Sequence, residues 1–155
     1  MIFYILFILI LSYGMANLEI QIEGGEGWAK NLPTWRIEKH WLLDVFFGGR
    51  AMTGYHFWML SFVFVLFHIG ILFAAEWSWL LEVRVIGGYI LMWAAEDFMW
   101  FVFNPKFGIR KFKKEHIPWH PNWIAGLPVE YWVFAPLCLL LIRYSYLGWT
   151  GMLSF

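Results

Sequence analysis

Long apolar runs alternate with shorter polar segments along the whole chain. A helix needs roughly 20 apolar residues to cross a bilayer, and several of the runs approach that length. The runs that predict transmembrane helices are residues 1–16, 55–75, 85–103 and 131–149. The first is the shortest, and it lacks the positive residues that precede the apolar part of a signal peptide. The pattern predicts an all-α membrane protein built as a four-transmembrane-helix bundle.

The longest polar segment, residues 17–54, separates the first two runs. It opens with LEIQIE, whose alternation of apolar and polar residues favours a half-buried strand. The glycine-rich GGEG that follows predicts a turn. Over residues 36–47 the apolar spacing becomes helical, and Trp41 is a suitable anchor at a membrane surface. We therefore expect an interfacial amphipathic helix between transmembrane helices 1 and 2, ended by Gly48 and Gly49.

The composition agrees with this interpretation. Hydrophobic residues make up 61% of the chain and charged residues 14%, whereas soluble domains are about half apolar and about a quarter charged. Residues 1–155 are expected to form a single integral membrane domain. The formal net charge is zero, so no nucleic-acid partner is expected. Membrane lipids are the expected partners, together with protein partners if the chain belongs to a larger membrane complex.

The polar segment between the third and fourth runs, residues 105–129, carries the densest group of basic residues. They are Lys106, Arg110, Lys111, Lys113 and Lys114. Because basic loops stay on the cytoplasmic side of a cell membrane, this segment is predicted to be cytoplasmic. The second and third helices form a hairpin between the two polar segments, so residues 17–54 are predicted to lie on the cytoplasmic side as well.

Three stretches of the chain carry a resemblance to known proteins. GWAKNLPTWR, TGYH and EDFMWFVFNPKFGIRKF resemble segments of an uncharacterised family of small prokaryotic integral membrane proteins. The resemblance extends over most of the chain. It implies a protein of this kind and no particular activity.

Two adjacent acids, Glu96 and Asp97, lie inside the third apolar run. Glu96 is seven residues before Phe103, about 10 Å along a helix that rises 1.5 Å per residue. An ionised acid at such a depth costs about 2.5–3.5 kcal/mol, and acids in membrane helices are by default functional. We expect Glu96 and Asp97 to be catalytic residues, Glu96 also binding a metal ion; a neutral acid or a buried ion pair is the alternative.

Neighbouring helix residues point about 100° apart, so the two acids are predicted to have different partners. Glu96 is expected to contact an imidazole or a metal ion, with His56 as the preferred histidine. Asp97 is expected to pair with Asn104 or with aromatic N–H groups.

Histidines gather near the same predicted interface, and the metal ligands expected from the sequence are His56, Glu96, His116 and His120. Imidazole and carboxylate groups suit Zn²⁺ or iron. On the interfacial helix, Glu38, His40 and Asp44 are additional candidates. The HIPWH stretch resembles the HxxxH boxes of membrane desaturases, but Pro118 and Pro121 oppose the helix that would bring its two histidines together. That pair is therefore a weak signal.

His68 lies deeper, about two-thirds of the way along the second run. It is the candidate cofactor-binding residue, as an axial ligand of haem or a chlorin, and a hydrogen bond across the bundle is the alternative.

Three functions fit these residues. The first is an integral membrane metalloprotein with a His/carboxylate site at the cytoplasmic interface, which would be an enzyme if it acts on a lipid-like substrate. The second is a non-catalytic accessory subunit of a larger membrane complex. The third is a haem or pigment carrier that uses His68.

Overall fold

The structure of the protein is a computed structural model, which describes residues 1–74 and 76–153. Its elements, in chain order, are α1 (Ile2–Glu23), β1 (Arg36–Ile37), α2 (Trp41–Phe46), β2 (Met52–Thr53), α3 (Gly54–Ala74), α4 (Trp79–Phe103), two 3₁₀ turns η1 (Ile109–Lys111) and η2 (Lys114–His116), β3 (Trp123–Ile124), β4 (Leu127–Pro128) and α5 (Val129–Leu153). Within the described ranges, four helices are long and apolar enough to span a membrane. The prediction of an all-α membrane bundle is confirmed.

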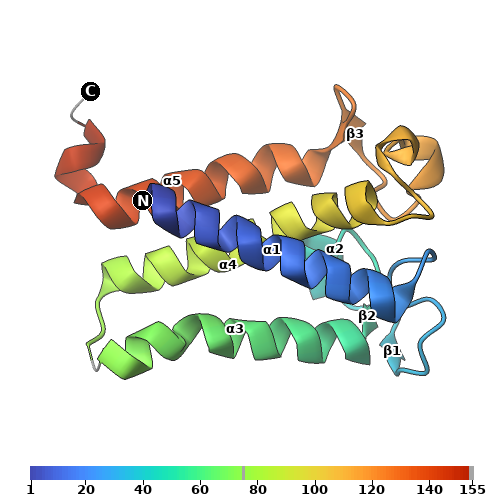
Figure 1. The fold of residues 1–155 in the computed structure, drawn as a ribbon, viewed down its shortest axis with the longest axis horizontal. Helices are drawn as coiled ribbons and strands as arrows, with labels where there is room; N and C mark the ends of the chain where they lie inside the picture. Colours follow the sequence, from blue (N-terminus) through green and yellow to red (C-terminus); the bar gives the residue numbers. More distant parts are fainter. Residues whose placement is uncertain (75, 154–155) are drawn as a thin grey trace.

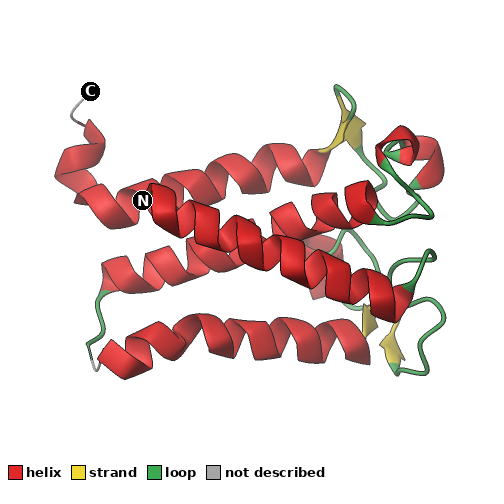
Figure 2. Ribbon diagram, viewed as in Figure 1, coloured by secondary structure: helices red, strands yellow, loops and turns green. Residues whose placement is uncertain are grey.

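The four long helices all run along the long axis of the molecule (Figure 1). Helices α3 and α5 lie on either side of α4, and α1 crosses obliquely over α4. All the short elements gather at one end of this bundle, where the two small sheets appear in yellow (Figure 2). The two polar segments therefore share one end of the molecule, as the sequence predicted. The pairings are antiparallel, with Arg36 opposite Thr53 and Trp123 opposite Pro128.

The first helix is longer than predicted, because α1 continues through LEIQIE to Glu23. The strand prediction for this stretch was wrong. Leu18 and Ile22 face the surroundings of the bundle, whereas Glu19, Ile20 and Glu23 face inward. The alternation that suggested a half-buried strand therefore belongs to a membrane helix whose inner face carries two acids.

The third helix also starts earlier than predicted, at Trp79 instead of residue 85. Ser78 caps it by accepting a hydrogen bond from the Leu81 amide at 3.2 Å. The charged residues of its first turns have partners. Glu82 accepts from Trp77, and the Arg84 guanidinium donates to the Ser145 backbone oxygen. Charge in this part of the sequence therefore did not mark a loop.

The remaining boundaries differ by smaller amounts. The second predicted helix, 55–75, is α3 from Gly54, and Ala75 lies outside the described residues. The fourth, 131–149, is α5, which begins at Val129 and bends at Gly148, where φ is 65°. The interfacial helix is shorter than expected, since Arg36 belongs to β1 and α2 starts only at Trp41.

Two apolar clusters hold the helices together. The mid-bundle cluster takes buried residues from all four long helices: Ile8, Val63, Leu91, Met92, Cys138 and Ile142. The second cluster lies at the end with the short elements and joins Ala16 and Ile20 of α1 to Trp100 and Phe101 of α4 and to Ile117. It places the loop of residues 105–128 against the helix ends, directly beside the acids of α1 and α4.

Candidate metal-binding pocket

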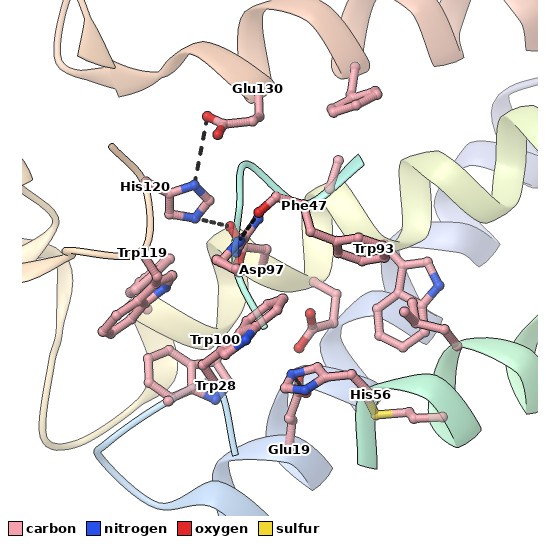
Figure 3. A pocket seen from close by; sticks show the side chains of 18 of the residues that line it. Glu19, Trp28, Phe47, His56, Trp93, Asp97, Trp100, Trp119, His120 and Glu130 are labelled. Atoms are coloured by element: carbon pink, nitrogen blue, oxygen red, sulfur yellow. Dashed lines mark hydrogen bonds and ion pairs between the residues drawn. The ribbon is translucent and has the colours of Figure 1, made fainter. Parts of the chain in front are cut away.

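A pocket of about 340 Å³ opens at the end of the bundle that carries the short elements. This volume falls within the range of small-molecule sites, about 300–1,000 Å³. Figure 3 shows its aromatic walls and the polar side chains that enter it from several elements. The ionisable side chains lining it are Glu19, Glu23, Arg50, His56, Glu96, Asp97, His120 and Glu130. Five carboxyl groups thus meet one guanidinium and two imidazoles in a largely apolar enclosure.

Glu19, Glu23 and His56 form the tightest group in the pocket. Each offers one ligand atom, and these atoms lie within 4.8 Å of one another. The Nε2 atom of His56 is 3.8 Å from Glu19 Oε1 and 3.6 Å from Glu23 Oε1. Glu19 and Glu23 are four residues apart on α1 and so share one helix face. These three groups could hold a metal ion, since one imidazole and two carboxylates are ligands that divalent metals accept.

Local structure fixes the His56 ring. Thr53, the last residue of β2, places its hydroxyl 2.7 Å from Nδ1, and the ring of Trp28 stacks on the imidazole at 4.2 Å between centroids. Metal-binding histidines usually engage their second ring nitrogen with a hydrogen-bond partner, which fixes the ring orientation. In this case Nδ1 is the engaged nitrogen and Nε2 points to the carboxylates.

Glu23 is held from the loop that follows α1. Its Oε1 atom accepts a hydrogen bond from the Ala29 amide at 2.5 Å. Trp28 and Ala29 both adopt the left-handed backbone region, with φ of 50° and 51°, where residues other than glycine are uncommon. This turn carries the amide back to the end of α1 and brings the Trp28 ring to His56.

Glu96 does not pair with His56, so that prediction was wrong. The Glu96 carboxyl group lies next to Glu19 instead, and its residue is only 4% exposed. Its Oε1 atom has no hydrogen-bond partner among the described residues. His56 lies at the start of α3, where its Nε2 atom faces Glu19 and Glu23 of α1 instead.

Of the two adjacent acids, Asp97 is the one that contacts an imidazole. The expectation that it pairs with Asn104 was therefore wrong. Its Oδ2 atom lies 3.1 Å from His120 Nε2 and accepts a hydrogen bond from the Tyr131 hydroxyl at 2.5 Å. The Nδ1 atom of His120 is 3.7 Å from Glu130 Oε2. Figure 3 shows His120 between the two acids. Asn104 instead donates to the backbone oxygen of Gly24 at 2.7 Å.

Arg50 is the positive group of the pocket. Its guanidinium carbon lies 4.2 Å from the centre of the Trp28 ring, and Nε donates to the Phe47 backbone oxygen at 2.8 Å. Burial lowers the pKa of Arg50, while the nearby Asp97 and Glu130 carboxylates oppose that shift. Arginine stays protonated in proteins, so one positive charge offsets one of the five carboxylates.

The other histidines predicted from the sequence lie elsewhere. His116 is exposed and His120 is buried, so the HIPWH stretch does not bring its two histidines into the pocket together. His40 caps α2 by accepting from the Leu42 amide. His68 has both ring nitrogens engaged, Nδ1 with the Phe64 backbone oxygen at 2.7 Å and Nε2 with Glu82 at 3.1 Å. The hydrogen-bonded alternative for His68 thus agrees with its geometry.

Several pocket residues were missed at the level of the sequence: Glu19, Glu23, Arg50, Glu130 and Tyr131. The signal for the first two was present, since acids four residues apart lie on one helix face. It was hidden by the strand interpretation of LEIQIE. The others depend on how the two polar segments fold over the helix ends, which no local pattern records. Glu38 and Asp44, the candidates on the interfacial segment, are exposed and do not line the pocket.

Comparison of the chain with protein-family models, with curated proteins and with solved structures finds no match. The chemistry of the pocket is therefore argued from its own residues. Several carboxylates in a low-dielectric site repel one another unless protons or a cation neutralise them. A divalent cation between Glu19, Glu23 and His56 fits both the charge and the spacing of these groups.

Proposed function

We propose that the protein is an integral membrane metalloprotein that binds a divalent transition metal ion through Glu19, Glu23 and His56. The observation that carries the proposal is the grouping of these three ligand atoms within 4.8 Å. One imidazole and two carboxylates suit Zn²⁺ and Fe²⁺. Glu96 lies next to Glu19 and is a further carboxylate beside such an ion.

A bound ion would supply Lewis-acid chemistry to a group held in the pocket. The chain's own residues supply a base elsewhere in the pocket. This base is His120, which is oriented by Asp97, and Asp97 in turn accepts a hydrogen bond from Tyr131. A histidine paired with a carboxylate is a common arrangement for accepting or donating a proton. This pairing supports an enzyme in preference to a metal store, with Asp97 as the positioning residue for His120.

We also propose that the pocket end faces the cytoplasm of a cell membrane. The basic residues Lys106, Arg110, Lys111, Lys113 and Lys114 all lie in the loop at that end. Basic loops of this length stay on the cytoplasmic side. A metal ion or a polar reactant would then reach the pocket from the cytoplasmic surface.

Metal titration of the purified protein in detergent micelles tests the proposal. We expect one Zn²⁺ or Fe²⁺ per chain in the wild type, and loss of this binding in His56→Ala and in Glu23→Gln. His116→Ala is the matched control, because His116 is exposed outside the pocket, and it should bind metal like the wild type. Stoichiometric binding that survives His56→Ala would overturn the ligand assignment. A wild type that binds no metal would favour the accessory-subunit alternative, and a visible haem or chlorin absorption would favour the carrier.

A further inference from the structure

The pocket continues beyond its acids into the membrane-spanning part of the bundle. This deeper region, which we name the apolar arm, is lined by Met59 and Leu60 of α3, Tyr89 and Ile90 of α4, and Phe134 of α5. Tyr89 lies seven residues from Glu96, about 10 Å along α4 at 1.5 Å per residue. Tyr89 and Ile90 are near the middle of α4 (Trp79–Phe103), so the arm reaches the depth of the hydrocarbon core of a bilayer.

The lining of the apolar arm is poorly suited to holding water. Its lining carries no charged side chain, and the Tyr89 hydroxyl already donates to the Leu60 backbone oxygen at 3.2 Å. A water molecule needs two to four polar partners to be stable inside a protein. A hydrocarbon chain needs none and gains from contact with apolar walls. Three spanning helices supply the walls, with α3 and α5 on opposite sides of α4 (Figure 1).

An unpaired donor and an unpaired acceptor lie where the apolar arm joins the polar part of the pocket. The indole Nε1 of Trp100 and the Oε1 atom of Glu96 are buried, and neither has a hydrogen-bond partner in the described part of the chain. Both residues are more than nine-tenths buried, at 5% and 4% exposure. They are four residues apart on α4 and so lie on one face of it, and both line the pocket. Buried polar groups are normally satisfied, so this pair points to a ligand.

A hydroxyl group has the hydrogen-bonding capacity that both atoms need. A hydroxyl donates one hydrogen bond and accepts others, so it can donate to Glu96 and accept from Trp100. A carboxylate or phosphate head would accept from Trp100 but would face five carboxyl groups against the single guanidinium of Arg50, with net repulsion in a low-dielectric site. The polar end of the pocket therefore selects against an anionic head.

We propose that the pocket binds a long-chain alcohol, with its hydrocarbon chain in the apolar arm and its hydroxyl between Glu96 and Trp100. The inference names the ligand class of the proposed metalloprotein, and it rests on that function for the metal ion beside the hydroxyl. Glu96 lies next to the metal ligand Glu19, so the hydroxyl would be the group nearest the ion. The chain would enter from the lipid, at the depth where the arm lies.

Photolabelling in phosphatidylcholine vesicles tests the inference. The probe is hexadecanol with a diazirine in its chain, and palmitic acid with the same diazirine is the anionic counterpart. We expect the alcohol to label the residues of the apolar arm and the acid to label them several-fold less. Leu60→Trp fills the arm and should abolish this labelling. Leu66→Trp is the control, because Leu66 is 43% exposed on the same helix and does not line the pocket.

Trp100→Phe tests the hydrogen bond to the hydroxyl of the alcohol without filling the apolar arm. The loss of one hydrogen bond is worth about 0.5–1.5 kcal/mol, so the concentration of alcohol for half-maximal labelling should rise about 2- to 12-fold. Equal labelling of Leu60→Trp and wild type would overturn the chain site, and equal labelling by alcohol and acid would overturn the head assignment. Metal titration and photolabelling of the wild type separate the two proposals. Normal metal binding without specific labelling rejects only the alcohol, whereas specific labelling of a protein that binds no metal rejects only the metal site.

Discussion

Replacing Glu96 by glutamine should stabilise the metal-free protein, although Glu96 is buried and belongs to the pocket. Its carboxyl group lies next to Glu19, and its Oε1 atom has no hydrogen-bond partner within the described ranges. Glutamine has nearly the same shape, and its N–H₂ group can donate to the Glu19 carboxylate at any pH, whereas the Glu96 carboxyl group can bond to Glu19 only while one of the two acids is protonated. A hydrogen bond to a charged group contributes about 1.5–3 kcal/mol. The variant also removes one of two neighbouring acids that repel each other when ionised.

The size of the effect can be followed by thermal unfolding in micelles with a metal chelator present. For a chain of this length, 1 kcal/mol shifts Tm by about 2–4 °C, so about 2 kcal/mol predicts a rise of about 4–8 °C in Glu96→Gln. Asp97→Asn is the control on the neighbouring residue and should act in the opposite direction. Asp97 accepts from Tyr131 and meets His120 at 3.1 Å, and these contacts lose their charge assistance in the amide.

Adding Zn²⁺ should change the order of the variants. A ligand that binds only the folded state adds about 2.7 kcal/mol at 100 times its Kd. Residues beside a metal ligand typically change affinity 10- to 100-fold, and a tenfold weaker site loses about 1.4 kcal/mol of that gain. The Zn²⁺-induced rise in Tm should therefore be smaller in Glu96→Gln than in the wild type. A Glu96→Gln protein that is less stable than the wild type in chelator would refute the reasoning, because Glu96 would then make favourable contacts as an acid.

Two further predictions concern the fold. In a Cys138→Ala background, cysteines at Lys30 and Lys113 should react alike with an impermeant thiol reagent from one side of sealed vesicles; opposite accessibility would contradict the shared end of the two polar segments. Asn104→Ala should lower the free energy of unfolding by about 1–3 kcal/mol, measured by thermal unfolding in micelles. The buried Asn104 side chain bonds to the Gly24 oxygen and the Lys106 amide, and each hydrogen bond contributes about 0.5–1.5 kcal/mol. An unchanged Tm would show that these pairs do not stabilise the junction of α1 and α4.

The spans and the shared end of the polar segments could be predicted from the sequence because they follow from length and hydropathy. The helix ends could not, because charged residues inside them have distant partners. Arg84 donates to Ser145, sixty-one residues later, and this contact makes a charge compatible with a membrane helix. The strand predicted over LEIQIE failed for a related reason. The same six residues fit both a strand with period-two alternation and a helix with two acids on its inner face. Which of the two forms depends on what surrounds the segment in the fold.

The pocket was predicted only in part. Glu96, Asp97, His56 and His120 do line it, since intramembrane acids and interfacial histidines are chemically conspicuous. Their partners differ from the predicted ones, because pairing depends on the fold of the loops. The hairpin β1–β2 sets His56 against α1, whose acids were not considered. The loop after α4 carries His120 back onto Asp97, a return that sequence spacing does not encode.

The distribution of the pocket residues along the chain has a consequence for biosynthesis. Glu19 and Glu23 emerge from the ribosome with α1, long before α3 delivers His56 and α4 delivers the second pair of acids. Until then α1 carries two carboxylates toward the bilayer with no protein partner, and an unpaired acid is costly in a membrane. We expect α1 to remain shallowly inserted or in contact with the insertion machinery until the α3–α4 hairpin arrives. A chain truncated after α1 would therefore be retained poorly in the membrane, even though this helix is among the most apolar segments of the protein.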